Sequence, residues 1–306
     1  MITSQIHRDK VLTNISIKYR NTDYIADQVF PKLPVKKETD EYFIFKKDAR
    51  IPETLRANRG MAREHTYKMT YATYYCKEHA LKDYISDRDK ANYDLGDIRT
   101  DVVEELTDKI MLRRENEVAS HFNVAAEASA SWAATVSLAA TQVWSSNSAG
   151  SDPIIITDTM ATEVVSNCFM EPNTFIMPKD IKRTFKRHVS ILDRIKYTSS
   201  NIDDNAIAAM LGVQKVLFPQ VYYQSTKEEA STTTYASLWG DNCWIGYIAP
   251  APGPRKVSAG YTFVMADSGV DRWYDEERSS EVIRVKEMYD PKLVATDAGA
   301  LIVNCT

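Results

Sequence analysis

The chain has 306 residues and a formal net charge of −4 at pH 7. At this length, folding buries roughly 75% of the surface that the unfolded chain exposes, so a large core forms without disulfide or metal staples. The acidic balance argues against a protein that grips nucleic acid over its whole surface, because such domains carry a clustered basic excess. The four cysteines lie far apart with no C-x-x-C pair, which is typical of free thiols in a reducing compartment.

The first 34 residues show little periodicity. They contain Pro31 and Pro34, which fix φ and remove backbone donors, so we expect residues 1–34 to form an extended arm. The N-terminus has no apolar signal region, and the best later apolar run, 244–249, is far too short to cross a bilayer. We therefore expect synthesis in the cytosol and no membrane partner.

Two runs of strand-forming residues follow, at 41–46 and 68–78, and both alternate with a period of two. They predict the two arms of a long β-hairpin within 35–78. Residues 46–63 between them hold six basic residues against two acidic ones, a charge that does not fit a core. We expect this tip to contact a neighbouring subunit through Lys46, Lys47, Arg50, Arg56, Arg59 and Arg63.

A long amphipathic helix is predicted over about 97–124. Asp97 or Thr100 is suited to cap it, and apolar residues recur every four positions from Ile98 to Ile110. Between residues 94 and 117 the chain holds eight acids against four bases. The acids expected to meet the basic tip of a neighbouring copy are Glu104, Glu105, Asp108, Glu115 and Glu117.

The stretch 125–151 is dominated by Ala and Ser, which indicates a connection between packed regions and a domain boundary near Asp152. Beyond it, helix and strand patterns alternate as in a compact α+β domain. The chain becomes strand-rich after the prolines at 250–254. Five bases between Lys179 and Arg187 leave a contact with phosphate open, although such runs are usually a solvated face.

Catalytic motifs are present only in outline. Asp267-Ser268-Gly269 matches one turn of an aspartic protease, whose mechanism needs two such carboxylates, and this tripeptide is above all a turn sequence. The five histidines never fall at the i, i+4 spacing of a helical zinc motif, and no phosphate-binding glycine loop or nucleophile elbow occurs. We expect no enzyme, cofactor or metal, and keep an aspartic-type hydrolase using Asp267 as a rival.

A series of short motifs runs in order from one end of the chain to the other. They are Asn14-Ile15-Ser16-Ile17, Tyr19-Arg20-Asn21, Asp23-Tyr24-Ile25-Ala26-Asp27, Val29-Phe30-Pro31, Pro34-Val35, Gln142 to Ser145, Ser151-Asp152-Pro153, Pro172-Asn173-Thr174, Leu238-Trp239-Gly240-Asp241 with Tyr247, and the terminal run Asp297 to Asn304. In this order they resemble the major capsid proteins of tailed bacteriophages, of the Hong Kong 97 type.

The resemblance implies an α+β capsid fold in five parts. These are an N-terminal arm (1–34), an extended loop that is a long β-hairpin (35–78), a peripheral domain with a spine helix (79–151, helix about 97–124), an axial domain (152–267) and return strands of the peripheral domain (268–306).

The resemblance also implies a coat protein that self-assembles into hexamers and pentamers of an icosahedral or prolate shell. The shell would enclose viral double-stranded DNA without sequence specificity. Further expected partners are a portal, a decoration protein and a scaffolding protein, the last as a separate chain because no charged helical region precedes the arm. The expected location is the virion capsid, assembled in the cytoplasm of a bacterial host. A cellular cargo-enclosing shell of the same fold is the alternative.

Overall fold

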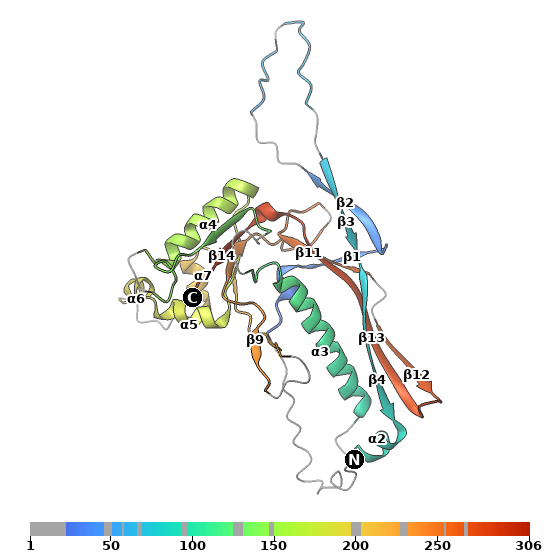
Figure 1. Ribbon diagram of the computed structural model, residues 1–306. Helices are drawn as coiled ribbons and strands as arrows, with labels where there is room; N and C mark the ends of the chain where they lie inside the picture. The colour runs from blue at the N-terminus through green and yellow to red at the C-terminus, as the bar shows by residue number, and fades with distance from the viewer. Residues whose placement is uncertain are drawn as a thin grey trace.

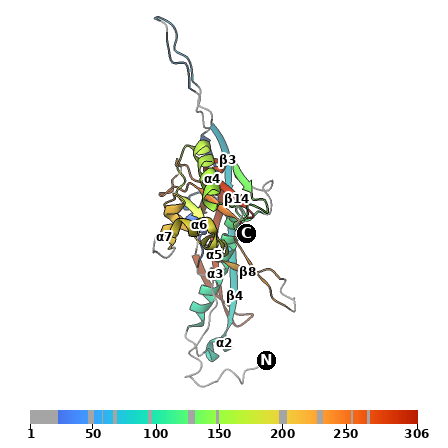
Figure 2. The same cartoon turned by 90° about the vertical axis from the view of Figure 1, so that its left-hand side faces the viewer.

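The computed structural model describes residues 23–45, 51–56, 58–65, 69–93, 97–124, 131–146, 150–196, 203–226, 232–253, 255–265 and 269–306. These residues form two five-stranded sheets and the helices that pack on them (Figure 1). A long hairpin extends away from this body (Figure 1). A view turned by 90° shows that the hairpin continues the line of β3 (Met69–Tyr75) and β4 (Lys77–Ser86) away from the rest of the molecule (Figure 2).

The first sheet is built around the long strand β13. Val282 of β13 lies opposite both Tyr84 of β4 and Trp273 of β12, so β13 lies between these two strands. β1 runs parallel to β11, and the other pairs are antiparallel. Besides β4, the strands are β1 (Lys32–Val35), β11 (Gly260–Met265), β12 (Gly269–Asp275) and β13 (Ser280–Leu293).

One long helix, α3 (Ile98–Ala119), lies across β13 and β4 (Figure 1). The Asp97 carboxylate caps it by accepting a hydrogen bond from the Arg99 N–H at 3.1 Å. Ile110 on its apolar face packs against Val285 and Tyr289 of the sheet. The helix predicted over about 97–124 is confirmed, although it ends at Ala119. The turn that follows buries Phe122 in an aromatic cluster with Trp132, Trp239 and Trp244.

The second sheet has the order β5, β14, β10, β6, β7 and carries helices that complete its core (Figure 1). Phe175, Ile245 and Ile302 from its strands pack with Ile181 and Phe185 of one helix. The strands are β5 (Ala134–Ser137), β6 (Thr174–Ile176), β7 (Lys215–Leu217), β10 (Cys243–Gly246) and β14 (Gly299–Val303). The helices are α4 (Pro153–Cys168), α5 (Lys179–Arg187), α6 (Val189–Ile195) and α7 (Asp204–Met210).

The C-terminal strand does not rejoin the first sheet. Ile302 of β14 lies opposite Cys243 of β10 and Val136 of β5, so the expectation that 268–306 returns as one unit to the peripheral domain is wrong for β14. All five residues of β14 are buried, a pattern that fits a strand covered on both faces. The domain boundaries expected at 151 and 267 do not separate the two sheets either. β5 precedes residue 151 but belongs to the second sheet, and β11 precedes residue 267 but belongs to the first sheet.

The remaining elements are short. Two further antiparallel pairs occur, β2 (Thr39–Phe45) with β3 and β8 (Tyr222–Gln224) with β9 (Tyr235–Ser237). The other helices are α1 (Ala26–Val29), α2 (Asp87–Asn92) and the 3-10 helix η3 (Thr296–Ala298). Within the described ranges, no helix combines the length and apolar character that crossing a membrane requires.

Candidate assembly interface

The predicted hairpin forms, and its two faces differ in what they contact. Because side chains alternate along each strand, Tyr42 and Tyr74 point to one face, where they pack on Phe263 with ring centroids 5.4 and 4.5 Å away. The opposite face carries large apolar side chains, and each of them is more than half exposed: Phe43, Met69, Tyr71 and Tyr75. One face of the hairpin therefore packs on its own chain, whereas the apolar side chains of the other face are exposed to solvent.

Beyond the strands, the loop holds apolar side chains that contact almost nothing. Ile51, Leu55 and Met61 are 98%, 88% and 97% exposed. Water rarely surrounds large apolar side chains so completely in a folded protein unless another molecule covers them. These three residues cannot be recognised from the sequence, because they lie without periodicity in a strongly basic segment and no signal separates them from ordinary loop residues.

Three of the predicted basic residues belong to the same described loop. Arg56, Arg59 and Arg63 are all exposed. The Arg56 guanidinium donates to the carbonyl of Gly60, and Arg59 has a left-handed φ of 63°, so the backbone turns sharply here. Lys46, Lys47 and Arg50, the other three predicted bases, lie outside the described residues.

The acids predicted on α3 differ in their surroundings. Glu104 and Glu105 are exposed. Asp108 is half-buried and accepts a hydrogen bond from the Tyr24 hydroxyl at 3.0 Å. Glu117 is half-buried and pairs with Arg113 at 2.9 Å, one turn earlier on the same helix. Glu104 and Glu105 are thus the predicted acids whose side chains are exposed.

Glu115 corrects the sequence-based expectation, because it is not at the surface. It is fully buried and accepts hydrogen bonds from the backbone N–H groups of Ile25 and Ala26 at 3.1 and 2.8 Å. The Trp239 indole N–H donates to it at 2.9 Å. Burial raises the pKa of this carboxyl above its ordinary value, against the effect of the three hydrogen bonds. Its role lies within the chain.

Ser151 and His188 are buried and adjacent, as in a catalytic serine–histidine dyad, but the hydrogen bond between them runs in the opposite direction. Nδ1 of His188 accepts a hydrogen bond from the Ser190 N–H, so the ring proton is on Nε2, which faces the Ser151 hydroxyl at 3.2 Å. That hydroxyl donates to the Val143 carbonyl at 2.7 Å. A nucleophilic serine needs a histidine that accepts its proton, so this pair joins structural segments.

Asp267 lies outside the described residues. Among the residues that the structure describes, no group of three or more His, Cys, Asp or Glu side chains is arranged to hold a metal ion. On α5, Lys179 pairs with Asp23 at 2.6 Å and Lys182 with Asp204 at 2.5 Å, so part of the basic run is neutralised within the chain.

The chain is similar in sequence to phage coat proteins. The major capsid protein of Burkholderia phage BcepMu is 27% identical to the chain, over 96% of the chain and 95% of its own length. The major capsid protein of Pseudomonas phage JBD67 is also 27% identical, over 70% of the chain and 67% of its own length. These similarities support a tailed-phage major capsid protein. No family model matches it.

Solved structures give the fold of this major capsid protein. A phage-related protein from Bordetella bronchiseptica superposes with a TM-score of 0.70 at 22% identity, over 94% of each chain. The capsid protein of cyanophage P-SCSP1u superposes with a TM-score of 0.64 at 9% identity, over 95% of this chain and 90% of its own. The predicted α+β capsid fold of the Hong Kong 97 type is confirmed. The major capsid protein is a structural component of the virion, and the cellular cargo shell is not favoured, because both named relatives are phage proteins.

Proposed function

We propose that this major capsid protein assembles into hexamers and pentamers of an icosahedral or prolate shell that encloses double-stranded DNA without sequence specificity. The observation that carries the proposal is the projecting hairpin, whose outer face and tip expose large apolar side chains. A subunit that leaves Tyr71 and Met61 in water has contacts still to make. Copies of the same chain supply them in a closed, repeated arrangement.

Apolar burial and charge have different parts in this assembly. Covering one large apolar side chain contributes about 1.5–3 kcal/mol, whereas an exposed ion pair contributes about 0–1 kcal/mol. The apolar face and tip of the hairpin therefore supply most of the affinity, while the arginines set register and association rate. Weak contacts repeated around each capsomer add up through multivalency.

The charged contact that we propose places the basic tip of one subunit over α3 of its neighbour. Arg56, Arg59 and Arg63 face Glu104 and Glu105, with Lys46, Lys47 and Arg50 adding to the positive side. Asp108 and Glu117 contribute less, because their side chains are half-buried whereas those of Glu104 and Glu105 are exposed. Glu115 is left out because it is buried.

Further partners follow from the role of a coat protein. We propose a separate scaffolding protein, a portal and a decoration protein, with assembly in the cytoplasm of the bacterial host and no catalytic activity of the coat itself. The charge of −4 supports DNA that is enclosed rather than tightly held, since strong phosphate binding needs a basic excess.

Charge reversal at the tip tests the proposal. Arg56→Glu, Arg59→Glu and Arg63→Glu combined should leave the subunit folded, because all three side chains are exposed, but should block closed particles. Size-exclusion chromatography shows whether the subunit is folded, and negative-stain microscopy shows whether closed particles form. The matched control combines Arg56→Lys, Arg59→Lys and Arg63→Lys, which keeps the charge and should keep assembly. A normal yield of particles from the glutamate variant contradicts the proposed register.

A further inference from the structure

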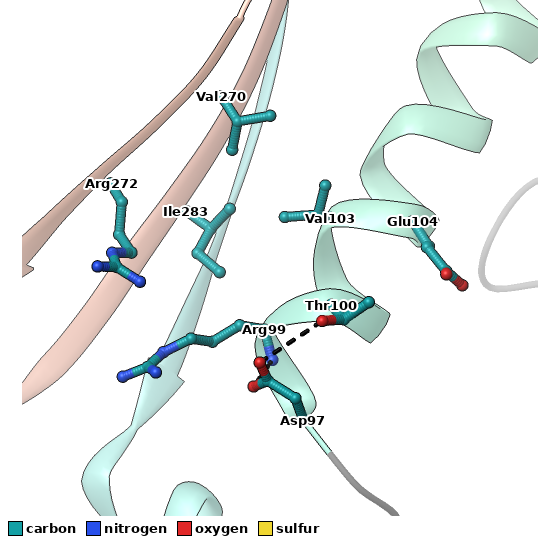
Figure 3. A pocket seen from close by; sticks show the side chains of 8 residues that line it. All are labelled: Asp97, Arg99, Thr100, Val103, Glu104, Val270, Arg272 and Ile283. Carbon is teal, nitrogen blue, oxygen red and sulfur yellow. Dashed lines mark hydrogen bonds between the residues drawn. The ribbon is translucent and has the colours of Figure 1, made fainter.

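The thiols of the chain lie away from the pocket that opens at its surface. That pocket, of about 470 Å³, lies between the first turns of α3 and the first sheet (Figure 3). Carboxylates, arginines, a threonine and apolar side chains line it, without a cysteine or a histidine among them. Two of the cysteines, Cys243 and Cys305, instead pack together in the core of the second sheet.

Two independent contacts place Cys305 beside Cys243. Cys243 of β10 lies opposite Ile302 of β14, the strand that Cys305 follows. Sγ of Cys305 donates a hydrogen bond to the carbonyl oxygen of this same Ile302 at 3.5 Å. The Cys305 N–H donates to the carbonyl of Asp241 at 3.0 Å, so its backbone is also tied to the segment that leads into β10.

A left-handed residue at Asn304 brings both thiols to the same face of the sheet. In a regular strand, residues 302 and 305 would lie on opposite faces, because successive side chains alternate. Asn304 has a φ of 59°, which interrupts the alternation, and its N–H donates to the side-chain oxygen of Asn242 at 3.2 Å. Cys305 therefore packs in the same apolar cluster as Cys243 and Ile302.

The two thiols touch each other and are closed off from solvent. Both cysteines are 0% exposed. Burial raises the pKa of the Cys243 thiol, and a hydrogen bond with the Cys305 thiol raises it further. The Trp144 N–H donates to the Cys305 carbonyl at 2.9 Å, which holds the backbone of Cys305 in place. Because the thiols are already hydrogen-bonded, rotation of the side chains brings the sulfurs to the about 2.0 Å of a disulfide bond.

We propose that Cys243 and Cys305 are a modification site, at which a peroxide converts the two thiols into a disulfide that cross-links the end of β14 to β10. A reducing compartment keeps such thiols free, whereas a virion outside a cell meets oxidants. The cross-link lies within one subunit, so it does not depend on the contacts proposed above for assembly.

The reaction consumes one peroxide for each disulfide. The sulfur of one thiol attacks the O–O bond of hydrogen peroxide, which breaks, and a sulfenic acid and one water form. The sulfur of the second thiol then attacks the sulfenic sulfur, the S–O bond breaks, and the disulfide and a second water form. The two thiols lose two electrons to the peroxide, and their two hydrogens leave in the waters.

Counting thiols after peroxide treatment tests the site. The parent for this experiment is Cys168→Ser, which removes the one half-buried cysteine and keeps the buried Cys76, Cys243 and Cys305. The folded full-length chain is treated with hydrogen peroxide, and the remaining thiols are blocked with a maleimide in denaturant. Mass spectrometry should find Cys76 blocked, and Cys243 and Cys305 in linked peptides that dithiothreitol separates. Three blocked thiols overturn the proposal.

Cys305→Ala and Cys243→Ala, each in the same parent, are the matched controls. Each removes one partner of the second step, so the linked peptides should be absent. Cys76 is the internal control, because its Sγ donates to the Phe263 carbonyl at 3.6 Å in a different apolar cluster. A disulfide that includes Cys76 instead of the proposed pair overturns the assignment of the site.

Thermal unfolding tests the effect of the cross-link. The disulfide closes a loop of about 60 residues, so the Tm of the oxidised parent should exceed that of the reduced parent by about 5 °C or more. Peroxide should raise the Tm of neither alanine variant. An unchanged Tm in a sample whose Cys243–Cys305 disulfide has formed overturns the proposed cross-linking of β14 to β10 as a stabilising device.

Discussion

The indole N–H of Trp239 donates a hydrogen bond of 2.9 Å to the carboxylate of Glu115 in the interior of the protein. The same carboxylate accepts the backbone N–H groups at the start of α1. Arg114, the preceding residue of α3, is also buried and pairs with Asp27 of α1 at 3.1 Å. Two neighbouring residues of the long helix therefore hold the N-terminal segment and the loop after β9 in place.

Glu115→Gln should lower the free energy of unfolding by about 1–3 kcal/mol, because an amide nitrogen replaces one acceptor oxygen and leaves a buried donor without a partner. Urea unfolding of the subunit measures the change. Glu117→Gln, on the half-buried side of the same helix, is the control and should cost less than about 1 kcal/mol. Equal midpoints for the two variants would show that the N-terminal segment does not depend on the Glu115 carboxylate.

His188, which caps α6, should make the stability of the protein sensitive to acid. His188 is 2% exposed, and burial lowers the pKa of its imidazole, although the nearby Asp152 carboxylate acts in the opposite direction. The unfolded chain then binds its proton at a higher pH than the folded chain does. Stability is therefore complete above the ordinary histidine pKa of about 6.5 and is lost as the pH falls from there toward the lowered value.

Unfolding at pH 7.5 and at pH 5.5 measures this loss. His188→Asn keeps a side chain that caps α6 and should reduce the difference between the two pH values. Part of the difference will remain, because burial lowers the pKa of His121 as well. His65→Asn, at an exposed histidine, should leave the difference unchanged. If the two variants behave alike, His188 is not the sensitive group.

Gly260 has no room for a side chain. A Cβ at this position would lie 2.5 Å from Cε1 of Phe30, whose fully buried ring also packs beside the ring of Phe122. Gly260→Ala should cost about 1–3 kcal/mol through overpacking, with a lower Tm in calorimetry. Gly269→Ala has nothing within 4 Å of the new Cβ and should change stability by less than about 0.5 kcal/mol. A Tm that is as high in Gly260→Ala as in Gly269→Ala would show that the N-terminal segment can shift away.

Periodicity predicted the local elements well, and it could not assign their partners. The capped helix from Asp97 and the alternating arms of the hairpin were predicted because both signals are local in the chain. The sequence predicts a surface position for Glu115, because a glutamate in an acidic helix is usually solvated. Its burial depends on Trp239, which is 124 residues away in the sequence.

The sequence by itself determined the two strands of the hairpin, the long capped helix and the charges of the tip, since backbone preferences and side-chain alternation act over a few residues. It did not predict α1 (Ala26–Val29), which lies within the segment 1–34 that was expected to be extended. Only the tertiary structure decided that β14 enters the second sheet, that Glu115 is internal, and that the hairpin exposes Phe43 and Tyr71 while burying Tyr74. These outcomes depend on which surfaces meet. Apolar burial is not directional, so it selects partners only when the whole chain has packed.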